Sequence, residues 1–194
     1  LTGLLRERGD LDGAVAVLRQ RADAGDIYAA EQLAELLRRR GDLDGAVAVL
    51  RRRADAGDSD AARQLAELLR ERGDLDELRR RADAGDSSAA RQLARLLRER
   101  GDLDGAVRVL RRRADAGDSD AARQLAELLR ERGDLDELRR RADAGDSSAA
   151  RQLAELLRER GDLDGAVAVL RRRADAGDTH AARQLAELLR EQTR

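Results

Sequence analysis

The residues of this chain that could do chemistry are one histidine, recurring aspartates and many arginines. His180 is the only histidine, and it stands in a Thr-His pair where other copies of the segment have Ser-Asp or Ser-Ser. No nucleophile or second base recurs with it, so no catalytic triad can be built. The chain has no cysteine, which excludes disulfides, thiolate metal ligands and a thiol nucleophile. We interpret His180 as a substitution at a helix start and expect that the chain is not an enzyme.

The aspartates Asp55, Asp58 and Asp60 recur along the chain at a spacing that raises the question of calcium. They lack the Asp-x-Asp-x-Asp-Gly loop and the distal glutamate of a calcium-binding loop, and helix capping explains them better. The Gly-Asp-Leu-Asp-Gly segments lack the glycine spacing and the lysine of a phosphate-binding loop. We therefore expect no metal and no cofactor.

The recurring Arg51-Arg52-Arg53 raises the question of nucleic acid. The side chains of three consecutive helical residues spread over about 200° around the helix axis, so they form no single basic stripe. The chain has 39 basic against 40 acidic residues and one tyrosine, which leaves little attraction for a polyanion and little stacking surface. An RNA-binding helical repeat stays a minor alternative. No apolar run approaches the roughly 20 residues that cross a bilayer, so we expect no membrane partner and a cytoplasmic location.

Internal repetition sets the architecture that must position these side chains. Residues 41–100 and 101–160 are identical except for Ala48 against Arg108 and Arg95 against Glu155. The Gly-Asp-Leu-Asp units start at residues 9, 41, 73, 101, 133 and 161, after a partial repeat at residues 1–8, and their spacing alternates between 32 and 28 residues after the first two. We predict one repeat domain over residues 1–194. The use of arginine alone as the basic residue favours amplified natural repeats in a GC-rich genome, with a designed repeat protein as the alternative.

The apolar residues of each unit are spaced with the period of an α-helix. Apolar residues at 61, 62, 65, 66, 68 and 69 predict an amphipathic helix over residues 61–72, which we call a first helix. Gly73 is expected to end it in the left-handed conformation, and Asp74 or Asp76 to cap the next helix. A second helix is predicted over residues 42–56, stopped by Gly57 and followed by capping residues 58–60. The fold class is therefore all-α.

The 28-residue units replace Gly-Ala-Val-Ala-Val by a single glutamate, Glu77 or Glu137. The loss of four residues shortens the second helix by about one turn, or roughly 6 Å, and leaves the apolar stripe nearly in place. We expect these short second helices to change packing and curvature at residues 73–100 and 133–160. A single hairpin cannot bury enough apolar surface to fold alone, so stability must come from stacking on neighbours.

The run Ala61-Ala62-x-x-Leu65-Ala66-x-x-Leu69, the turn Gly73-Asp74, and Ala46 and Leu50 in the long second helices resemble the tetratricopeptide repeat. The Sel1-like repeat is an equally reasonable label. The sequence departs from the tetratricopeptide repeat in two ways. Alanine and leucine stand where that repeat has bulky aromatic residues, and the proline at the end of the repeat is missing. The resemblance implies a right-handed α-solenoid of antiparallel helical hairpins.

The resemblance also implies a protein-protein interaction scaffold that holds a peptide or protein partner in a groove lined by the exposed faces of the first helices. Arginine binds carboxylates through paired hydrogen bonds, so an acidic or C-terminal segment is the expected partner. The alternative is that these side chains are solvated Arg-Glu pairs that keep the helices soluble. The candidate residues are Arg63, Gln64, Glu67, Arg70, Arg91, Gln92, Arg95, Arg123, Gln124, Glu127, Arg151, Gln152 and Glu155.

Self-assembly is the alternative function. Neither end of the chain shows an obvious polar cap, and the last helix still carries Leu185, Leu188 and Leu189 where another repeat would stack. Uncapped solenoids can associate end to end. The pair Ile27-Tyr28 is an apolar exception at a position that is otherwise polar, and marks a candidate contact with whatever precedes it or a simple divergence.

Overall fold

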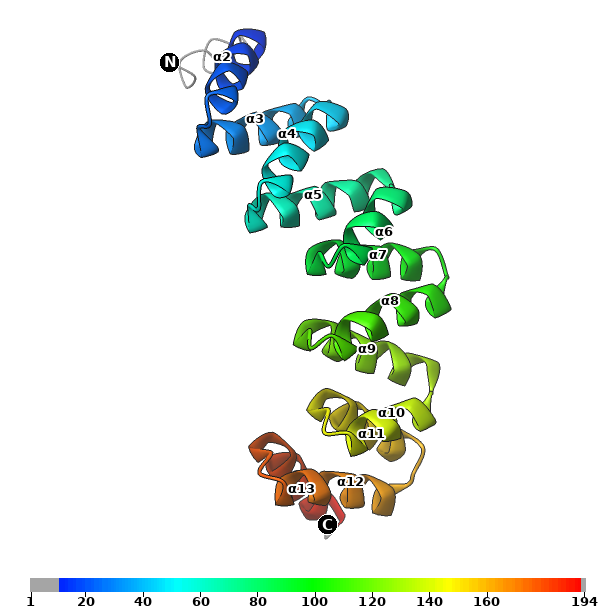
Figure 1. The fold of residues 1–194 in the computed structure, drawn as a ribbon. Helices are drawn as coiled ribbons and strands as arrows, with labels where there is room; N and C mark the ends of the chain where they lie inside the picture. Colours follow the sequence, from blue (N-terminus) through cyan, green and yellow to red (C-terminus); the bar gives the residue numbers. More distant parts are fainter. Residues whose placement is uncertain (1–10, 193–194) are drawn as a thin grey trace. The chain divides into compact units, whose positions relative to one another are not determined.

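A computed structural model describes residues 11–192, which form twelve helices and no strands. The second helices are α2 (Leu11–Asp23), α4 (Leu43–Asp55), α6 (Leu75–Asp83), α8 (Leu103–Asp115), α10 (Leu135–Asp143) and α12 (Leu163–Asp175). The first helices are α3 (Ile27–Arg39), α5 (Ser59–Arg72), α7 (Ser87–Glu99), α9 (Ser119–Arg132), α11 (Ser147–Glu159) and α13 (Thr179–Gln192). Successive helices turn back on one another as hairpins (Figure 1). The predicted all-α solenoid of helical hairpins is confirmed.

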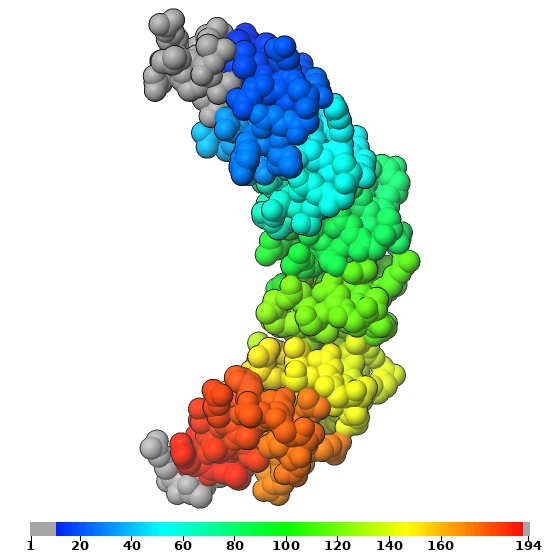
Figure 2. Space-filling view, turned by 60° about the vertical axis from the view of Figure 1, so that its left-hand side comes forward, coloured from blue at the N-terminus to red at the C-terminus, as the bar shows by residue number. Residues whose placement is uncertain are grey.

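The described helices form two compact units, which are divided between Leu96 and Leu97, inside α7. Within each unit the hairpins follow one another in chain order as a continuous stack (Figure 2). The predicted partial repeat of residues 1–8 lies outside the described residues. The predicted unit starts from residue 41 onward all fall in the turns between helices, where each glycine has a positive φ.

Aspartate caps start the helices as the sequence predicts. The Ala61 N–H donates to Asp58 Oδ1 at 2.9 Å, and the Glu77 N–H donates to Asp74 Oδ1 at 3.1 Å. Asp74, and not Asp76, is therefore the cap of the second helix α6. Gly73 ends α5 with a φ of 71°, in the left-handed region that glycine adopts without a steric cost.

The capping carboxylates make the fold sensitive to acid. The hydrogen bond from the Ala61 N–H holds the pKa of Asp58 below its usual value, and the corresponding bonds at Ala29 and Ala181 do the same for Asp26 and Asp178. A carboxyl with a lowered folded-state pKa stabilises the fold fully above its unfolded pKa of about 4, and this contribution is lost as the pH falls through the folded-state value. We expect the melting temperature to fall from about pH 5 downward.

The matched control is the triple variant Asp26→Asn, Asp58→Asn and Asp178→Asn. Asparagine caps helices about as well as aspartate but does not titrate in this range. A series of thermal melts between pH 7 and pH 2.5 should therefore show a smaller loss of melting temperature for the triple variant. Parallel losses would show that these three caps do not contribute to the acid sensitivity.

Leucine and alanine build the core. Leu65, Leu69 and Leu78 have no exposed surface, and neither do Ala61 and Ala66. The small alanines let neighbouring helices approach closely while the leucines fill the space between them. A core of this kind needs no aromatic side chain, which is consistent with the absence of tryptophan and phenylalanine from the sequence.

The length of a second helix decides how closely the first helices on either side of it pack. In the unit that begins at Leu97, the second helix α10 has 9 residues, and the first helices α9 and α11 that flank it pack directly on each other. The second helix α12 has 13 residues, and a cavity lies between its flanking helices α11 and α13. A cavity of the same kind lies between α3 and α5, which flank the 13-residue α4. The expected change of packing at residues 133–160 is thus present as direct contact between α9 and α11.

Candidate functional site

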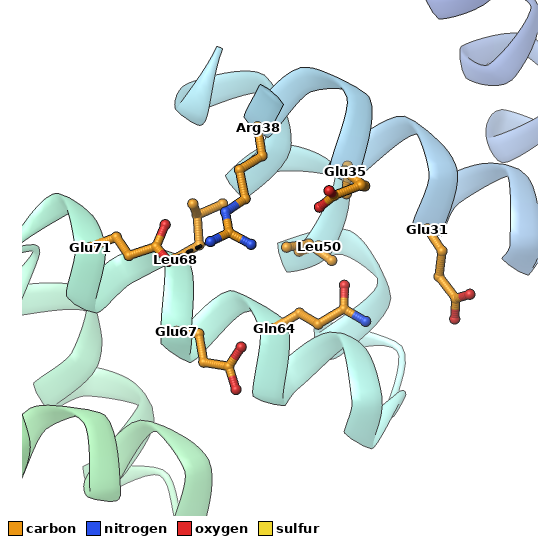
Figure 3. Close-up of a pocket in the computed structure, with 9 residues that line it drawn as sticks. Glu31, Glu35, Arg38, Leu50, Gln64, Glu67, Leu68 and Glu71 are labelled. Atoms are coloured by element: carbon orange, nitrogen blue, oxygen red, sulfur yellow. Dashed lines mark hydrogen bonds and ion pairs between the residues drawn. The ribbon is translucent and has the colours of Figure 1, made fainter. Parts of the chain in front are cut away.

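The cavity between α3 and α5 has a volume of about 310 Å³ (Figure 3). Its apolar lining consists of Ala34 from α3, Leu50 from α4 and Leu68 from α5. These three side chains belong to the core and are nearly buried, so they present only a small apolar floor to solvent. Leu50 contributes to the floor because α4 is the second helix that lies between α3 and α5 in the chain and packs on both.

The rim of this cavity is acidic. Glu31 and Glu35 come from α3, Glu67 and Glu71 come from α5, and the only lining cation is Arg38. Arg38 Nη2 donates to Glu71 Oε1 at 2.7 Å across the cavity mouth, and this ion pair links the two first helices (Figure 3). The rim therefore carries four carboxylates and one guanidinium.

The cavity between α11 and α13 is built from the same positions, 120 residues later, and has a volume of about 180 Å³. Of the nine lining residues, only one differs in type between the two cavities: Arg151 takes the place of Glu31. Glu155 in this cavity also accepts a hydrogen bond from Arg130 of α9 at 3.1 Å. The two cavities form a natural pair with the same apolar floor and different rim charge.

Four of the residues predicted from the sequence line these cavities: Gln64 and Glu67 in the first, and Arg151 and Glu155 in the second. The other predicted residues do not line either one. Arg63 lies 3.5 Å from Asp60, and Arg123 lies 2.8 Å from Asp120, so both form ion pairs within their own helix, as the alternative of solvated pairs expects. Arg91 donates to Ser88 Oγ at 3.3 Å. Arg95 and Glu127 are exposed, and Arg70, Gln92 and Gln124 are half-buried.

One predicted site residue is corrected by the structure. Gln152 was expected on an exposed helix face, but its exposed fraction is 6%. The short second helix α10 lets α9 pack directly on α11, and this contact covers the face that carries Gln152. Gln64 occupies the same position in α5, but it is only half-buried and lines the cavity beside the long second helix α4.

The sequence reasoning missed Glu31, Glu35, Arg38 and Glu71, which complete the first cavity. The sequence did contain a signal for Glu31 and Glu35. At the positions of Glu31 and Glu35, the later first helices α7 and α11 carry Arg91 with Arg95 and Arg151 with Glu155. The sign of the charge changes at these two positions, whereas the alanines and leucines around them stay the same.

The apolar residues of α13 are only partly uncovered. Leu189 is 37% exposed and Leu185 is half-buried, but Leu188 is buried, so the expectation that all three await a further repeat is wrong for Leu188. Leu188 lies instead in the lining of the cavity between α11 and α13. Ile27 and Tyr28, at the start of α3, are 57% and 75% exposed.

A second group of charges lies on the short second helices. Glu77 at the start of α6 is only 8% exposed, and Arg81 Nε donates to its Oε1 at 3.0 Å. Arg51 of the neighbouring α4 lies 3.4 Å from the same oxygen, and Arg80 binds the other one. Burial acts to raise the pKa of Glu77, but the hydrogen bonds and charges of these arginines outweigh it and hold the pKa below its usual value. In the other unit, Glu137 repeats this arrangement, as do its three arginines.

The described residues contain no group of three or more metal-binding side chains. Among the helices of residues 11–192, none has both the length and the apolar character needed to cross a membrane.

Comparison with known proteins places the chain among helical repeats. The tetratricopeptide repeat model matches residues 3–20, 27–52, 87–112 and 147–172. The last three segments each begin in a first helix and end in a 13-residue second helix, so the hairpins with the short helices α6 and α10 are left unmatched. No curated protein sequence matches the chain.

Many solved structures resemble it, and three of them serve as examples. One is the structure of Naa15/Naa10 bound to HypK-THB, with 16% identity and a TM-score of 0.49, covering 95% of this chain and 32% of that one. The chain thus spans about a third of that protein's length. A tetratricopeptide repeat protein from Parabacteroides merdae has 14% identity and a TM-score of 0.40, covering 97% and 81%. YrrB, described as a TPR protein with an unusual peptide-binding site, has 17% identity and a TM-score of 0.36, covering 96% and 88%.

Proposed function

The chain is a tetratricopeptide-like helical repeat protein, and we propose that it is a scaffold that binds a segment of a protein partner across its first helices. The observation that carries this proposal is the pair of equivalent cavities between consecutive first helices, each with an apolar floor and a charged rim. A volume of about 310 Å³ lies at the lower end of the range for small-molecule sites, and suits one or two side chains of a bound segment.

The pattern of variation supports a binding role for this face. The apolar floor of the two cavities is the same, while a rim position changes from Glu31 to Arg151. A surface whose only task is solubility needs charge but has no need of a cavity beneath it. An apolar floor and a rim that varies in charge are two elements of an interface, the first for affinity and the second for specificity.

The test is a selection of peptides from a random displayed library on the purified chain, followed by affinity measurements on the double variant Gln64→Trp and Gln184→Trp. Each indole would fill one cavity from its rim, because both glutamines line the cavities. We expect the selected peptides to lose at least about tenfold in affinity, which is the loss typical of a blocked central contact.

The control for this test is Ala48→Trp, which adds the same indole to an exposed position of the second helix α4. It should leave the affinity unchanged, and circular dichroism should show the same helix content for both variants. Peptides that bind the double variant as tightly as the original chain would dock elsewhere, and the proposal would then be wrong.

The exposure of Leu189 favours a second candidate function, which is end-to-end association of copies of the chain. Light scattering after size-exclusion chromatography, over a hundredfold range of concentration, separates the two functions. A molar mass that stays at 21.3 kDa argues against association, and a mass that rises with concentration and falls again on Leu185→Glu with Leu189→Glu supports it.

A further inference from the structure

We propose that the cavity between α3 and α5 binds the side chain of a lysine or arginine from the partner segment, in contrast to the acidic segment expected from the sequence, and that the equivalent cavity between α11 and α13 has lost this preference. The inference rests on the proposed function, because it names the chemistry of the segment that the scaffold would bind. It concerns the one position at which the two cavities differ.

The two cavities differ in net charge. Its lining carries four carboxylates and one guanidinium, a net charge of −3. The lining of the second cavity carries Glu155, Glu187 and Glu191 against Arg151 and Arg158, a net charge of −1. A cleft with low-dielectric walls and one sign of charge concentrates ions of the opposite sign, so the first cavity favours a cation more strongly.

The shape of the first cavity suits a long cationic side chain and not a small ion. Lysine and arginine lay their methylene groups on apolar surface while the charged head stays among polar groups. Ala34, Leu50 and Leu68 supply such a surface at the floor, and the glutamates of both first helices stand around it (Figure 3). Arg38 already has this arrangement, since it lies across the cavity and pairs with Glu71 at 2.7 Å.

Two of the rim carboxylates, Glu31 and Glu67, form only long ion pairs and can still bind an incoming cation closely. Arg53 lies 3.6 Å from Glu31, and Arg63 lies 3.4 Å from Glu67. Both distances are longer than the 2.7–2.9 Å of a strong charge-assisted hydrogen bond. Glu35 and Glu71 are more fully engaged, each with an arginine at 2.7 Å. The cation is therefore expected between Glu31 and Glu67, which lie on opposite helices.

The second cavity lacks one of these two carboxylates. Arg151 replaces Glu31 and brings a positive charge to the place where the cation would bind. Glu155, the equivalent of Glu35, is engaged as well, by Arg130 of α9 at 3.1 Å. The cavity is also smaller, at about 180 Å³.

The absence of cysteine from the chain allows a direct test. The variants Gln64→Cys and Gln184→Cys each place one thiol at the rim of one cavity. Each variant is equilibrated with an equal mixture of bis(2-aminoethyl) disulfide and bis(2-hydroxyethyl) disulfide, and mass spectrometry measures which of the two mixed disulfides forms. Both reagents compete for the same thiol, so the pKa of that thiol does not affect their ratio.

We expect the ratio of cationic to neutral product to be about fivefold higher for Gln64→Cys than for Gln184→Cys at low salt, as two surface charge interactions would give. The difference should largely disappear in 1 M salt, where charges are screened over about 3 Å. Adding Glu31→Arg to the first variant should lower its ratio to that of the second, and adding Arg151→Glu to the second should raise its ratio.

Equal ratios in the two variants, or a ratio that does not respond to Glu31→Arg, would overturn the proposal. The peptide selection separates this failure from failure of the proposed function. Peptides that depend on Gln64 but lack lysine and arginine would overturn the cation preference alone, while peptides indifferent to the filled cavities would overturn the scaffold proposal whatever the ratio. A molar mass that rises with concentration and is restored by Glu31→Arg would show that the cation belongs to a second copy of this chain, and would overturn the assignment to a partner.

Discussion

Replacing Glu77 by alanine is expected to lower the free energy of unfolding by about 3 kcal/mol, the cost typical of removing one partner from a buried ion pair. Glu77 is 8% exposed and is held by arginines from its own helix and from α4. Without the carboxylate, the guanidinium groups of Arg51 and Arg81 face each other in a partly buried site, and only Arg81 keeps another acidic partner, Asp55 at 2.8 Å. Urea unfolding followed by circular dichroism measures the loss.

The chain supplies its own controls for this variant. Glu137→Ala removes the equivalent carboxylate in the other unit and should cost a similar amount. Glu35→Ala removes an exposed pair with Arg39, one helical turn apart, and should cost less than about 1 kcal/mol. A loss for Glu77→Ala no larger than that for Glu35→Ala would show that the buried network does not stabilise the fold.

The cost of Glu77→Ala should also depend on pH. The arginines hold the pKa of Glu77 below its usual value, so the carboxylate contributes fully above its unfolded pKa of about 4.3 and loses that contribution as the pH falls through the folded-state value. The difference in stability between the original chain and Glu77→Ala should therefore be largest near neutral pH and shrink in acid.

Leu129→Ala is expected to lower the free energy of unfolding by about 3 kcal/mol, whereas Leu189→Ala at the same position of the repeat should cost less than about 1 kcal/mol. Leu129 in α9 has no exposed surface, while Leu189 in α13 is 37% exposed. The second helix α10 follows α9 in the chain and packs on it. The described residues contain no helix that follows α13 and could cover Leu189 in the same way. A leucine that is already partly in water loses less transfer free energy and leaves a smaller cavity.

The comparison is well controlled because the two leucines lie in the same local sequence, Ala-Ala-Arg-Gln-Leu-Ala-Glu-Leu-Leu-Arg-Glu. Helix propensity changes equally in both variants, so any difference reports tertiary burial alone. Urea unfolding of the two variants side by side gives the result. Equal losses would mean that Leu189 is covered in solution as fully as Leu129.

Much of the fold could be predicted because it depends on residues that lie close together in the chain. The apolar spacing of residues 61–72 predicts α5, the left-handed Gly73 ends it, and Asp58 caps it as expected. The candidate site was harder to predict. Gln64 and Gln152 occupy the same position of the first helix, yet one lines a cavity and the other is buried. The difference arises from the length of the second helix between two first helices, which decides how closely those two first helices pack.

The sequence by itself determined the helices, their caps and turns, the all-α class and the relation to the tetratricopeptide repeat, because each of these follows from spacing, capping chemistry and internal repetition within about one repeat length. Only the tertiary structure decided which copies of a repeated residue are exposed. It showed that Glu31, outside the nearly identical repeats, completes an acidic cavity, that Glu77 forms a buried pair with arginines of two helices, and that Leu189 is open where Leu129 is covered. The physical reason is that burial and charge environment are set by the neighbouring hairpin, and identical segments have different neighbours.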